Sequence, residues 1–334
     1  MKTAGLVGLA LCFLARSVLA GEVSWNVWLK SPEVSQGGVA EIRASGEDIE
    51  TVKGFFRNRE ITFFTGQGSY DAILGVDLEE KAGPVRIAIQ GWNKVGEKRE
   101  KYVILRVRKK LFPREKITVP EVFDRLDEAT KKRIEGEQEQ INRLWAIASP
   151  RRLWEGRFVA PVSGGITSPF GLRRFVNGSA RSPHGGVDLK AALETEIFAA
   201  NHGRVVLREE FFFSGKSLVL DHGGGLYTMY FHLADFHVEK DSQVRKGDLI
   251  GWAGKTGRVT GPHLHWGVRL NGARVDPFEL LEATGDGSTT RLSSPKSALP
   301  SSPEPQAEGS GSSTEAHSKS SPPKGRQQTI GRRQ

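Results

Sequence analysis

The sequence predicts a mainly β protein with an N-terminal β-sandwich-like domain, a helical linker, a C-terminal antiparallel β domain and a disordered C-terminal tail. Three observations support this prediction. Short runs of strand-like residues, separated by turn-forming residues, recur before residue 110 and after residue 156. One stretch between them has helical periodicity. The residues after 284 contain almost no large apolar side chains.

The first twenty residues are expected to be a secretory signal peptide rather than part of the fold. A short basic start precedes the apolar run AGLVGLALCFLA, residues 4–15, which is shorter than a membrane-spanning helix. Small residues then precede Gly21, so we expect cleavage near Ala20 and export to the periplasm or cell envelope. An uncleaved membrane anchor is the alternative, and the short apolar run argues against it.

Composition narrows the possible chemistry and partners. Cys12 is the only cysteine, so a chain cleaved near Ala20 would hold any metal through His, Asp or Glu. The formal net charge of +9 suits an anionic polymer or surface, although most such charge is simply solvated. Export argues against nucleic acid as a partner. Contact with a membrane is expected to be peripheral at most, and no regulatory protein partner can be named.

Residues 21–110 are predicted to form the β-sandwich-like domain. The runs VRIAIQ (residues 85–90) and YVILRVR (residues 102–108) alternate apolar and polar side chains, as half-buried strands do. Breaks such as SQGG and WNKVGEK separate these runs, which is typical of a small β-sandwich. No polar cluster in this part indicates chemistry.

Residues 111–155 are predicted to be a helical linker. Apolar side chains recur there at mainly helical spacing, namely Phe123, Leu126, Ile134, Ile141, Leu144, Trp145 and Ala148. This pattern predicts one amphipathic helix, or two if Gly136 interrupts it, and Pro150 ends it. The linker could cover a groove of the following domain or serve only as a spacer, and the sequence leaves both open.

Residues 156–283 are predicted to form the antiparallel β domain, and residues 284–334 a disordered tail. Strand-like runs such as LYTMYFHL and HLHWGVRL alternate with turn signals such as GGG and LNGA. The tail is rich in Ser, Pro and basic residues and has too little apolar surface to order itself.

Seven of the eight histidines lie between residues 184 and 265. His263 and His265 stand two residues apart, so a strand would point both rings to the same side. His184 and Asp188 stand four apart, as on one face of a helix. However, two glycines lie between them, so we expect a loop running into a strand.

These side chains predict a metal site. A catalytic zinc ion typically takes three protein ligands from His nitrogen and carboxylate oxygen and keeps one position for water. One imidazole of the HxH pair would bind the ion and the other would face the reacting water. His202 and His222 lie beside turn glycines and are expected to be structural, and His237 to be exposed.

The motifs HGGVD, YFHL and GPHLHWGV resemble, in this order, those of the lysostaphin-type zinc endopeptidases, the LytM or M23 family. The flanking phrases ITSPFGLRR and VDPFELL agree, and the resemblance covers residues from about 160 to 282. It implies that His184, Asp188 and His265 bind Zn²⁺ and that His232 and His263 form the catalytic pair. One departure concerns a turn, where Glu194 and Glu196 stand at positions that are usually Gly and Pro.

The resemblance also implies a function. It predicts a zinc-dependent metalloendopeptidase that hydrolyses peptide bonds in peptidoglycan, in stem-peptide cross-links or bridges, for cell-wall remodelling. His263 would accept a proton from the attacking water, and His232 would hydrogen-bond the developing oxyanion or exchange protons. The hydroxyl of Tyr230 could reach the cleft if it shares a strand face with His232, but a packed aromatic is the simpler interpretation.

Two other interpretations stay open. Some relatives are non-catalytic LytM-like regulators that bind and activate a cell-wall amidase, but these lack zinc ligands, whereas this sequence has the full set. A structural zinc site is the third interpretation, and it would need His232 and His263 as further ligands. The run from Phe211 to Phe213 could be a lip of the groove or part of the core.

Overall fold

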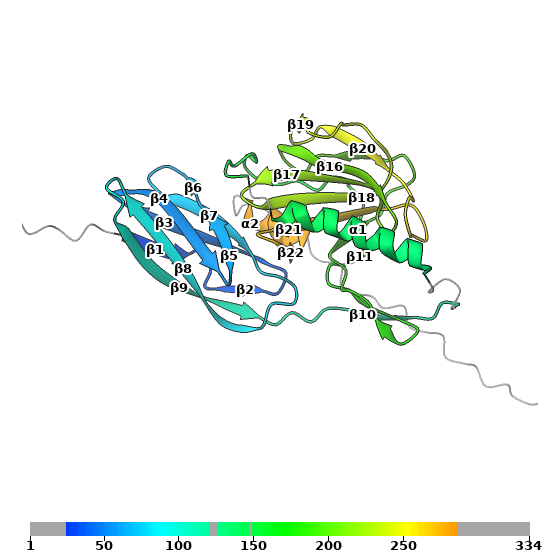
Figure 1. Cartoon of the computed structure of the whole chain (residues 1–334), viewed down its shortest axis with the longest axis horizontal. Coiled ribbons are helices and arrows are strands. Elements are labelled where there is room, and N and C mark those ends of the chain that lie inside the picture. The colour runs from blue at the N-terminus through cyan, green and yellow to red at the C-terminus, as the bar shows by residue number, and fades with distance from the viewer. Residues whose placement is uncertain (1–24, 121–125, 147–148, 286–334) are drawn as a thin grey trace, which may run out of the picture. The chain divides into compact units, whose positions relative to one another are not determined.

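The computed structural model describes residues 25–120, 126–146 and 149–285 (Figure 1). The expected signal peptide, nearly all of the expected tail, Phe123 and Ala148 lie outside these residues. The described part is mainly β, as predicted, and contains two helices. None of its helices combines the length and apolar character needed to cross a membrane.

Two sheets share one apolar core in the N-terminal part. Their strand orders are β1-β3-β7-β6 and β2-β9-β8-β4-β5. The strands are β1 (Trp25–Leu29), β2 (Glu33–Ser35), β3 (Val39–Gly46), β4 (Ile49–Phe56), β5 (Arg59–Thr62), β6 (Phe64–Thr65), β7 (Tyr70–Gly75), β8 (Gly83–Asn93) and β9 (Lys98–Arg108). The alternation predicted for β8 is observed, because Val85, Ile87 and Ile89 are buried. Ile42 of β3 and Leu105 of β9 belong to the same core, so the sandwich-like fold is confirmed.

The segment between the two β-rich parts contains strand β10 (Arg114–Ile117) and helix α1 (Glu128–Trp145). The helix begins after Asp127, whose side chain accepts a hydrogen bond from the amide of Thr130 at 2.7 Å. It continues through Gly136, so the alternative of an interruption there is wrong. Gly136 is exposed, and a glycine in a helix costs only about 1 kcal/mol. The helical periodicity gave no sign of β10.

Helix α1 packs its apolar side against the C-terminal sheet (Figure 1). A separate apolar cluster forms there from Ile141, Leu144, Trp145, Leu207, Phe211, Val219, Tyr227 and Met229. The ring of Trp145 meets that of Tyr227 edge-on, with centroids 5.2 Å apart. Strands β17 and β18 therefore have apolar contacts on both faces, which explains why their residues are buried almost continuously instead of alternately.

The C-terminal part is built on a ten-stranded sheet whose main path is β11-β14-β21-β18-β17-β16-β19. The elements are β11 (Ile166–Ser168), β12 (Arg173–Val176), β13 (Ser179–Ala180), β14 (Gly186–Leu189), β15 (Glu196–Phe198), β16 (Gly203–Phe211), β17 (Gly215–Gly223), β18 (Leu226–Phe236), β19 (Gln243–Val244), β20 (Leu249–Ala253), β21 (Leu264–Leu270), β22 (Ala273–Val275) and α2 (Pro277–Ala283). Trp266 and Tyr230 are the largest fully buried side chains of its core. The central strands β14, β18 and β21 carry Asp188, His232 and His265, respectively. His263 directly precedes β21, so four of the five predicted site residues lie on these strands or next to them.

Candidate active site

The pairing of β14 with β21 brings the first two candidate ligands together. The two strands are antiparallel, and Asp188 lies directly opposite His265. His184 precedes β14 by two residues. Gly186, between His184 and Asp188, lies so close to β21 that a Cβ there would be 2.4 Å from the carbonyl oxygen of Trp266. The glycine therefore allows β14 to approach β21 closely, as the interpretation of HGGVD as a loop entering a strand requires.

Three side-chain atoms that could bind a metal ion converge at this point. The Oδ1 atom of Asp188 lies 3.0 Å from Nε2 of His184 and 2.9 Å from Nδ1 of His265. The two ring nitrogens lie 2.9 Å from each other. Among the described residues, these three form the group of His and carboxylate side chains that could hold a metal ion. Two of the three come from strands, and the third comes from the loop that enters β14.

The donor set fits a zinc ion. Ligand atoms around a tetrahedral zinc lie roughly 3.3–3.6 Å apart, so the observed separations need only small adjustments. Burial alone would raise the pKa of Asp188, but hydrogen bonds from His184 and His265 outweigh it and lower the pKa, so Asp188 is ionised. Burial lowers the pKa of His265, although its bond to Asp188 acts in the opposite direction. One carboxylate and two imidazoles are ligands that zinc accepts.

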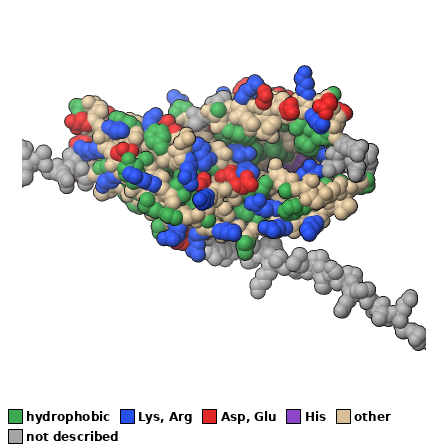
Figure 2. Space-filling model, turned by 60° about the horizontal axis from the view of Figure 1, so that its bottom comes forward, with side chains coloured by type: hydrophobic (Ala, Val, Ile, Leu, Met, Phe, Trp, Pro, Cys, Tyr) green, Lys and Arg blue, Asp and Glu red, His purple; other side chains and the backbone are tan. Residues whose placement is uncertain are grey.

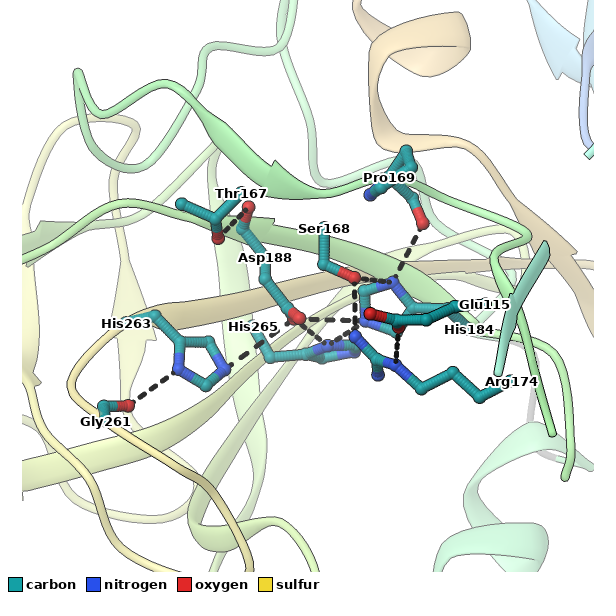
Figure 3. Close-up of polar contacts among 10 residues, drawn as sticks. All are labelled: Glu115, Thr167, Ser168, Pro169, Arg174, His184, Asp188, Gly261, His263 and His265. Carbon is teal, nitrogen blue, oxygen red and sulfur yellow. Dashed lines mark hydrogen bonds and ion pairs between the residues drawn. The ribbon is translucent and has the colours of Figure 1, made fainter. Parts of the chain in front are cut away.

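The ring of His184 is oriented by a hydrogen bond at Nδ1, the ring nitrogen that does not face Asp188. Its Nδ1 lies 3.0 Å from the carbonyl oxygen of Pro169 and donates to it, which leaves Nε2 as the ring atom that faces Asp188 (Figure 3). Ser168 Oγ lies 3.4 Å from the same Nδ1. A ligating histidine usually has its second ring nitrogen held in this way, because that contact fixes the tautomer.

His263 points to the same side as His265, as the HxH spacing predicts. Its Nδ1 lies 2.9 Å from the carbonyl oxygen of Gly261 and donates to it (Figure 3). The opposite nitrogen, Nε2, lies 3.8 Å from Oδ1 of Asp188. His263 thus places its Nε2 beside the three candidate ligands without being one of them.

His232 reaches the site because β18 is irregular there. The pairing of β17 with β18 shifts register at this point, and His232 adopts φ +64°. Its amide donates to the carbonyl oxygen of Ser214 at 2.9 Å, and its Nδ1 donates to that of Thr256 at 3.0 Å. Its ring centroid lies 4.9 Å from that of His263. Burial and the nearby His265 lower the pKa of His232 to about 4, so the ring is neutral at pH 7.

The same irregularity decides between the two interpretations of Tyr230 and confirms the packed aromatic. A regular strand would place Tyr230 and His232 on one face, but the left-handed residue breaks the alternation. Tyr230 is fully buried, and its hydroxyl accepts a hydrogen bond from the amide of Ala200 at 3.0 Å, away from the site. Phe231, which lies opposite His265, instead stacks on the His265 ring, with centroids 5.3 Å apart.

The other aromatic and histidine candidates lie outside the site. His222 is fully buried, with its Nδ1 2.7 Å from the carbonyl oxygen of His202, and His237 is exposed. Phe211 is part of the apolar cluster beneath α1, whereas the side chain of Phe213 is exposed at the end of the β16–β17 hairpin. From the sequence, residues Phe211 to Phe213 could belong either to the core or to the lip of a groove. In the structure, Phe211 belongs to the core and Phe213 lies at the surface.

No sequence pattern indicates the groups that support the site. Pro169, Gly261 and Thr256 contribute backbone carbonyl oxygens, which carry no side-chain signature. Arg174 also lies near His184, and no motif of the sequence indicates it (Figure 3). Figure 2 shows a hollow on one face of the molecule in which histidine side chains are visible, with lysine and arginine side chains around it. A ligand could therefore reach this face.

Comparison with known proteins places this geometry in a family. Residues 182–277 match the model of peptidase family M23. A solved structure from Pseudomonas aeruginosa, named for peptidase M23, is 30% identical, with a TM-score of 0.60, and the match covers 76% of this chain and 97% of that one. The chain belongs to peptidase family M23. The resemblance noted from the HGGVD, YFHL and GPHLHWGV motifs is thereby confirmed.

Curated relatives of this M23 chain match over a shorter stretch. The peptidoglycan DD-endopeptidase ShyA of Vibrio cholerae is 37% identical over 115 residues, which are 34% of this chain and 27% of ShyA. The DD-carboxypeptidase/endopeptidase Mpg of Neisseria meningitidis is 37% identical over 119 residues, which are 36% of this chain and 27% of Mpg. The M23 chain thus matches about a quarter of the length of each of these relatives.

Proposed function

We propose that the chain is a zinc-dependent endopeptidase that hydrolyses peptide bonds in peptidoglycan. One observation carries the proposal: three candidate ligands converge within hydrogen-bonding distance, and the rings of two further histidines lie beside them. Membership of family M23 and the names of ShyA and Mpg support the reaction and the substrate.

His184, Asp188 and His265 would hold the metal ion. A zinc ion bound there would supply Lewis acidity for a peptide carbonyl and for a water molecule. The protein's own contribution to proton transfer is carried by His232 and His263. Both donate their Nδ1 proton to a backbone carbonyl, which leaves Nε2 as the ring nitrogen that would accept a proton and later return it. Because the pKa of His232 is lowered, that ring is neutral and available as a base at pH 7.

The proposal also covers the cellular location of the protein and the bond that it cuts. We infer that the chain is exported to the periplasm or cell envelope, because residues 1–20 have the pattern of a signal peptide. Without Lys2 and Arg16 of residues 1–20, the chain keeps 46 basic and 39 acidic residues, and this net charge of +7 favours contact with an anionic wall. The names of ShyA and Mpg favour D,D-bonds of stem-peptide cross-links over bridge peptides as the bond cut.

Digestion of purified peptidoglycan tests the proposal. The chain lacking residues 1–20 is incubated with peptidoglycan, with and without a chelator, and the fragments are identified by mass. We expect peptide products that a chelator abolishes and added Zn²⁺ restores, and none from Asp188→Ala. If the chain released no peptide but increased the activity of an added amidase, the regulator interpretation would replace the enzyme.

A further inference from the structure

Strand β10 of the linker is joined to a hairpin beside the candidate metal ligands. β10 pairs in parallel with β12, and β12 pairs with β13, which together make a separate three-stranded sheet. Just before β10, the carbonyl oxygen of Pro113 accepts a hydrogen bond from the amide of Arg173 at 2.9 Å. At the last residue of β10, the carbonyl oxygen of Ile117 accepts one from the amide of Asn177 at 3.0 Å.

Phe112 packs onto the turn that leads into β12. Its ring lies edge-on to that of Phe170, with centroids 6.1 Å apart. A Cβ at Gly171, where φ is +76°, would lie only 2.1 Å from the Phe112 ring. The linker and this turn are therefore fitted closely to each other, and no larger residue could replace Gly171 without moving Phe112.

The same turn holds His184 in place. The amide of Gly171 donates to the carbonyl oxygen of His184 at 2.8 Å, and the amide of His184 donates to that of Leu172 at 3.0 Å. The Nδ1 atom of His184 donates to Pro169. Three hydrogen bonds between His184 and residues 169–172 thus fix both the backbone of His184 and the direction of its Nε2 atom.

A line of polar contacts connects β10 with the ring of His184 (Figure 3). Arg174 Nε donates to Oε2 of Glu115 at 2.9 Å, and Arg174 Nη2 donates to Ser168 Oγ at 3.0 Å. Ser168 Oγ in turn lies 3.4 Å from Nδ1 of His184. Glu115 belongs to the linker, whereas Arg174 and Ser168 belong to the C-terminal β domain. An acidic side chain from outside the matched M23 segment therefore orients an arginine next to a candidate metal ligand.

We propose that the segment around β10 supports the active site and that Phe112 and Glu115 are positioning residues for His184. Phe112 holds the turn at residues 169–172, and Glu115 holds Arg174 against Ser168. The linker then acts neither as a cover nor as a passive spacer. This inference rests on the metal-binding role proposed for His184, and it concerns residues outside the segment that matches family M23.

Variants of the chain lacking only residues 1–20 test this inference. Phe112→Ala and Glu115→Gln should each weaken Zn²⁺ affinity, measured by competition with a metal-binding dye. We expect a loss of about threefold to tenfold, at or below the lower end of the usual cost of changing a group that supports a ligand. They should also lower kcat while leaving KM nearly unchanged. Lys116→Gln is the matched control, because its side chain lies on the opposite face of β10.

A double variant tests the route from Glu115. If Glu115 acts through Arg174, then Glu115→Gln combined with Arg174→Gln should weaken Zn²⁺ binding no more than Arg174→Gln alone. Additive losses would overturn this route. Zn²⁺ affinity and kcat equal to those of the parent in both Phe112→Ala and Glu115→Gln would overturn the positioning role altogether.

Amide hydrogen exchange separates this inference from the proposed function. It is measured in the metal-free chain, so it needs neither bound zinc nor activity. We expect faster exchange at Gly171, Arg173 and His184 in Phe112→Ala and Glu115→Gln, with unchanged exchange in the core strand β17. Unchanged exchange at these amides would overturn the inference. If the parent bound no metal but the variants did show faster exchange, the proposed function would fail while the positioning contact would stand.

Discussion

Asp188 and His265 lie directly opposite each other on strands β14 and β21, and their donor atoms are 2.9 Å apart. Strand pairing therefore sets the distance between two candidate ligands that are 77 residues apart in the sequence. His184 completes the group from the loop before β14. A site built in this way depends on the sheet, so changes to its side chains should alter metal binding without unfolding the domain.

We expect Asp188→Asn to lose metal while retaining the fold. The substitution keeps the size of the side chain but removes the charge that attracts a cation, so Zn²⁺ affinity should fall by more than about a hundredfold. Metal content after dialysis and near-ultraviolet circular dichroism measure the two effects. His237→Ala, at an exposed histidine outside the site, is the control. Retention of stoichiometric zinc by Asp188→Asn would remove Asp188 from the ligand set.

His232→Ala and His263→Ala should keep metal and lose turnover. Neither ring belongs to the group of three donors, and each presents Nε2 for proton transfer. Removing a general acid or base typically lowers the rate by about 10²–10⁴-fold. Metal analysis and kcat for a peptidoglycan fragment are measured on the same samples. If His232→Ala lost zinc, the division into ligands and catalytic residues would have to be redrawn.

The buried His222 should make stability depend on pH. Burial lowers its pKa to about 4 in the folded state, below the usual value of 6.5, so the unfolded chain binds the proton more readily. The contribution of His222 is therefore present above pH 6.5 and is lost as the pH falls towards 4. The free energy of unfolding should drop by about 2 kcal/mol between pH 7 and pH 5 through this group.

Urea unfolding of the metal-free chain at the two pH values measures this dependence. A chelator is present throughout, so that loss of bound zinc does not contribute. His222→Gln cannot take up the proton and should show a drop smaller by about the same amount, although it is less stable at both pH values. An identical pH dependence in the parent and in His222→Gln would rule out this role for His222.

Gly186→Ala should be destabilising, because an added methyl group would lie 2.4 Å from the carbonyl oxygen of Trp266 on β21. Overpacking of this kind costs about 1–3 kcal/mol. Gly165→Ala is the matched control, since a Cβ there meets no atom within 4 Å. Urea unfolding gives both free energies. Equal stability of the two variants would show that β14 and β21 can separate without cost.

Glu194→Gly should be stabilising. Glu194 has φ +65°, a left-handed conformation that costs a residue with a side chain about 1 kcal/mol or more and costs glycine little. The resemblance to the family implies glycine at this position, and the positive φ of Glu194 agrees with local strain there. Glu196→Gly, in the extended strand β15, should instead be destabilising. A higher melting temperature for Glu194→Gly and a lower one for Glu196→Gly would agree with this explanation.

The sequence alone determined the class of the fold and pointed to the residues of the candidate site. Alternating runs predict strands because a strand's side chains alternate between its two faces. The spacing of His263 and His265 predicts two rings on one side for the same reason, and the structure places them so. The absence of cysteine after residue 20 restricts the ligands to His, Asp and Glu. All of these features are local, and local patterns can be read from a linear sequence.

Only the tertiary structure decided how these groups are oriented. The left-handed conformation at His232 turns that ring towards the ligands and Tyr230 into the core, against the alternation expected of a strand. The pairing of β10 with β12 joins residues about sixty positions apart, and the tautomers of His184 and His263 depend on backbone carbonyls of distant or turn residues. Such contacts arise from the packing of whole elements and leave no periodic trace in the order of amino acids.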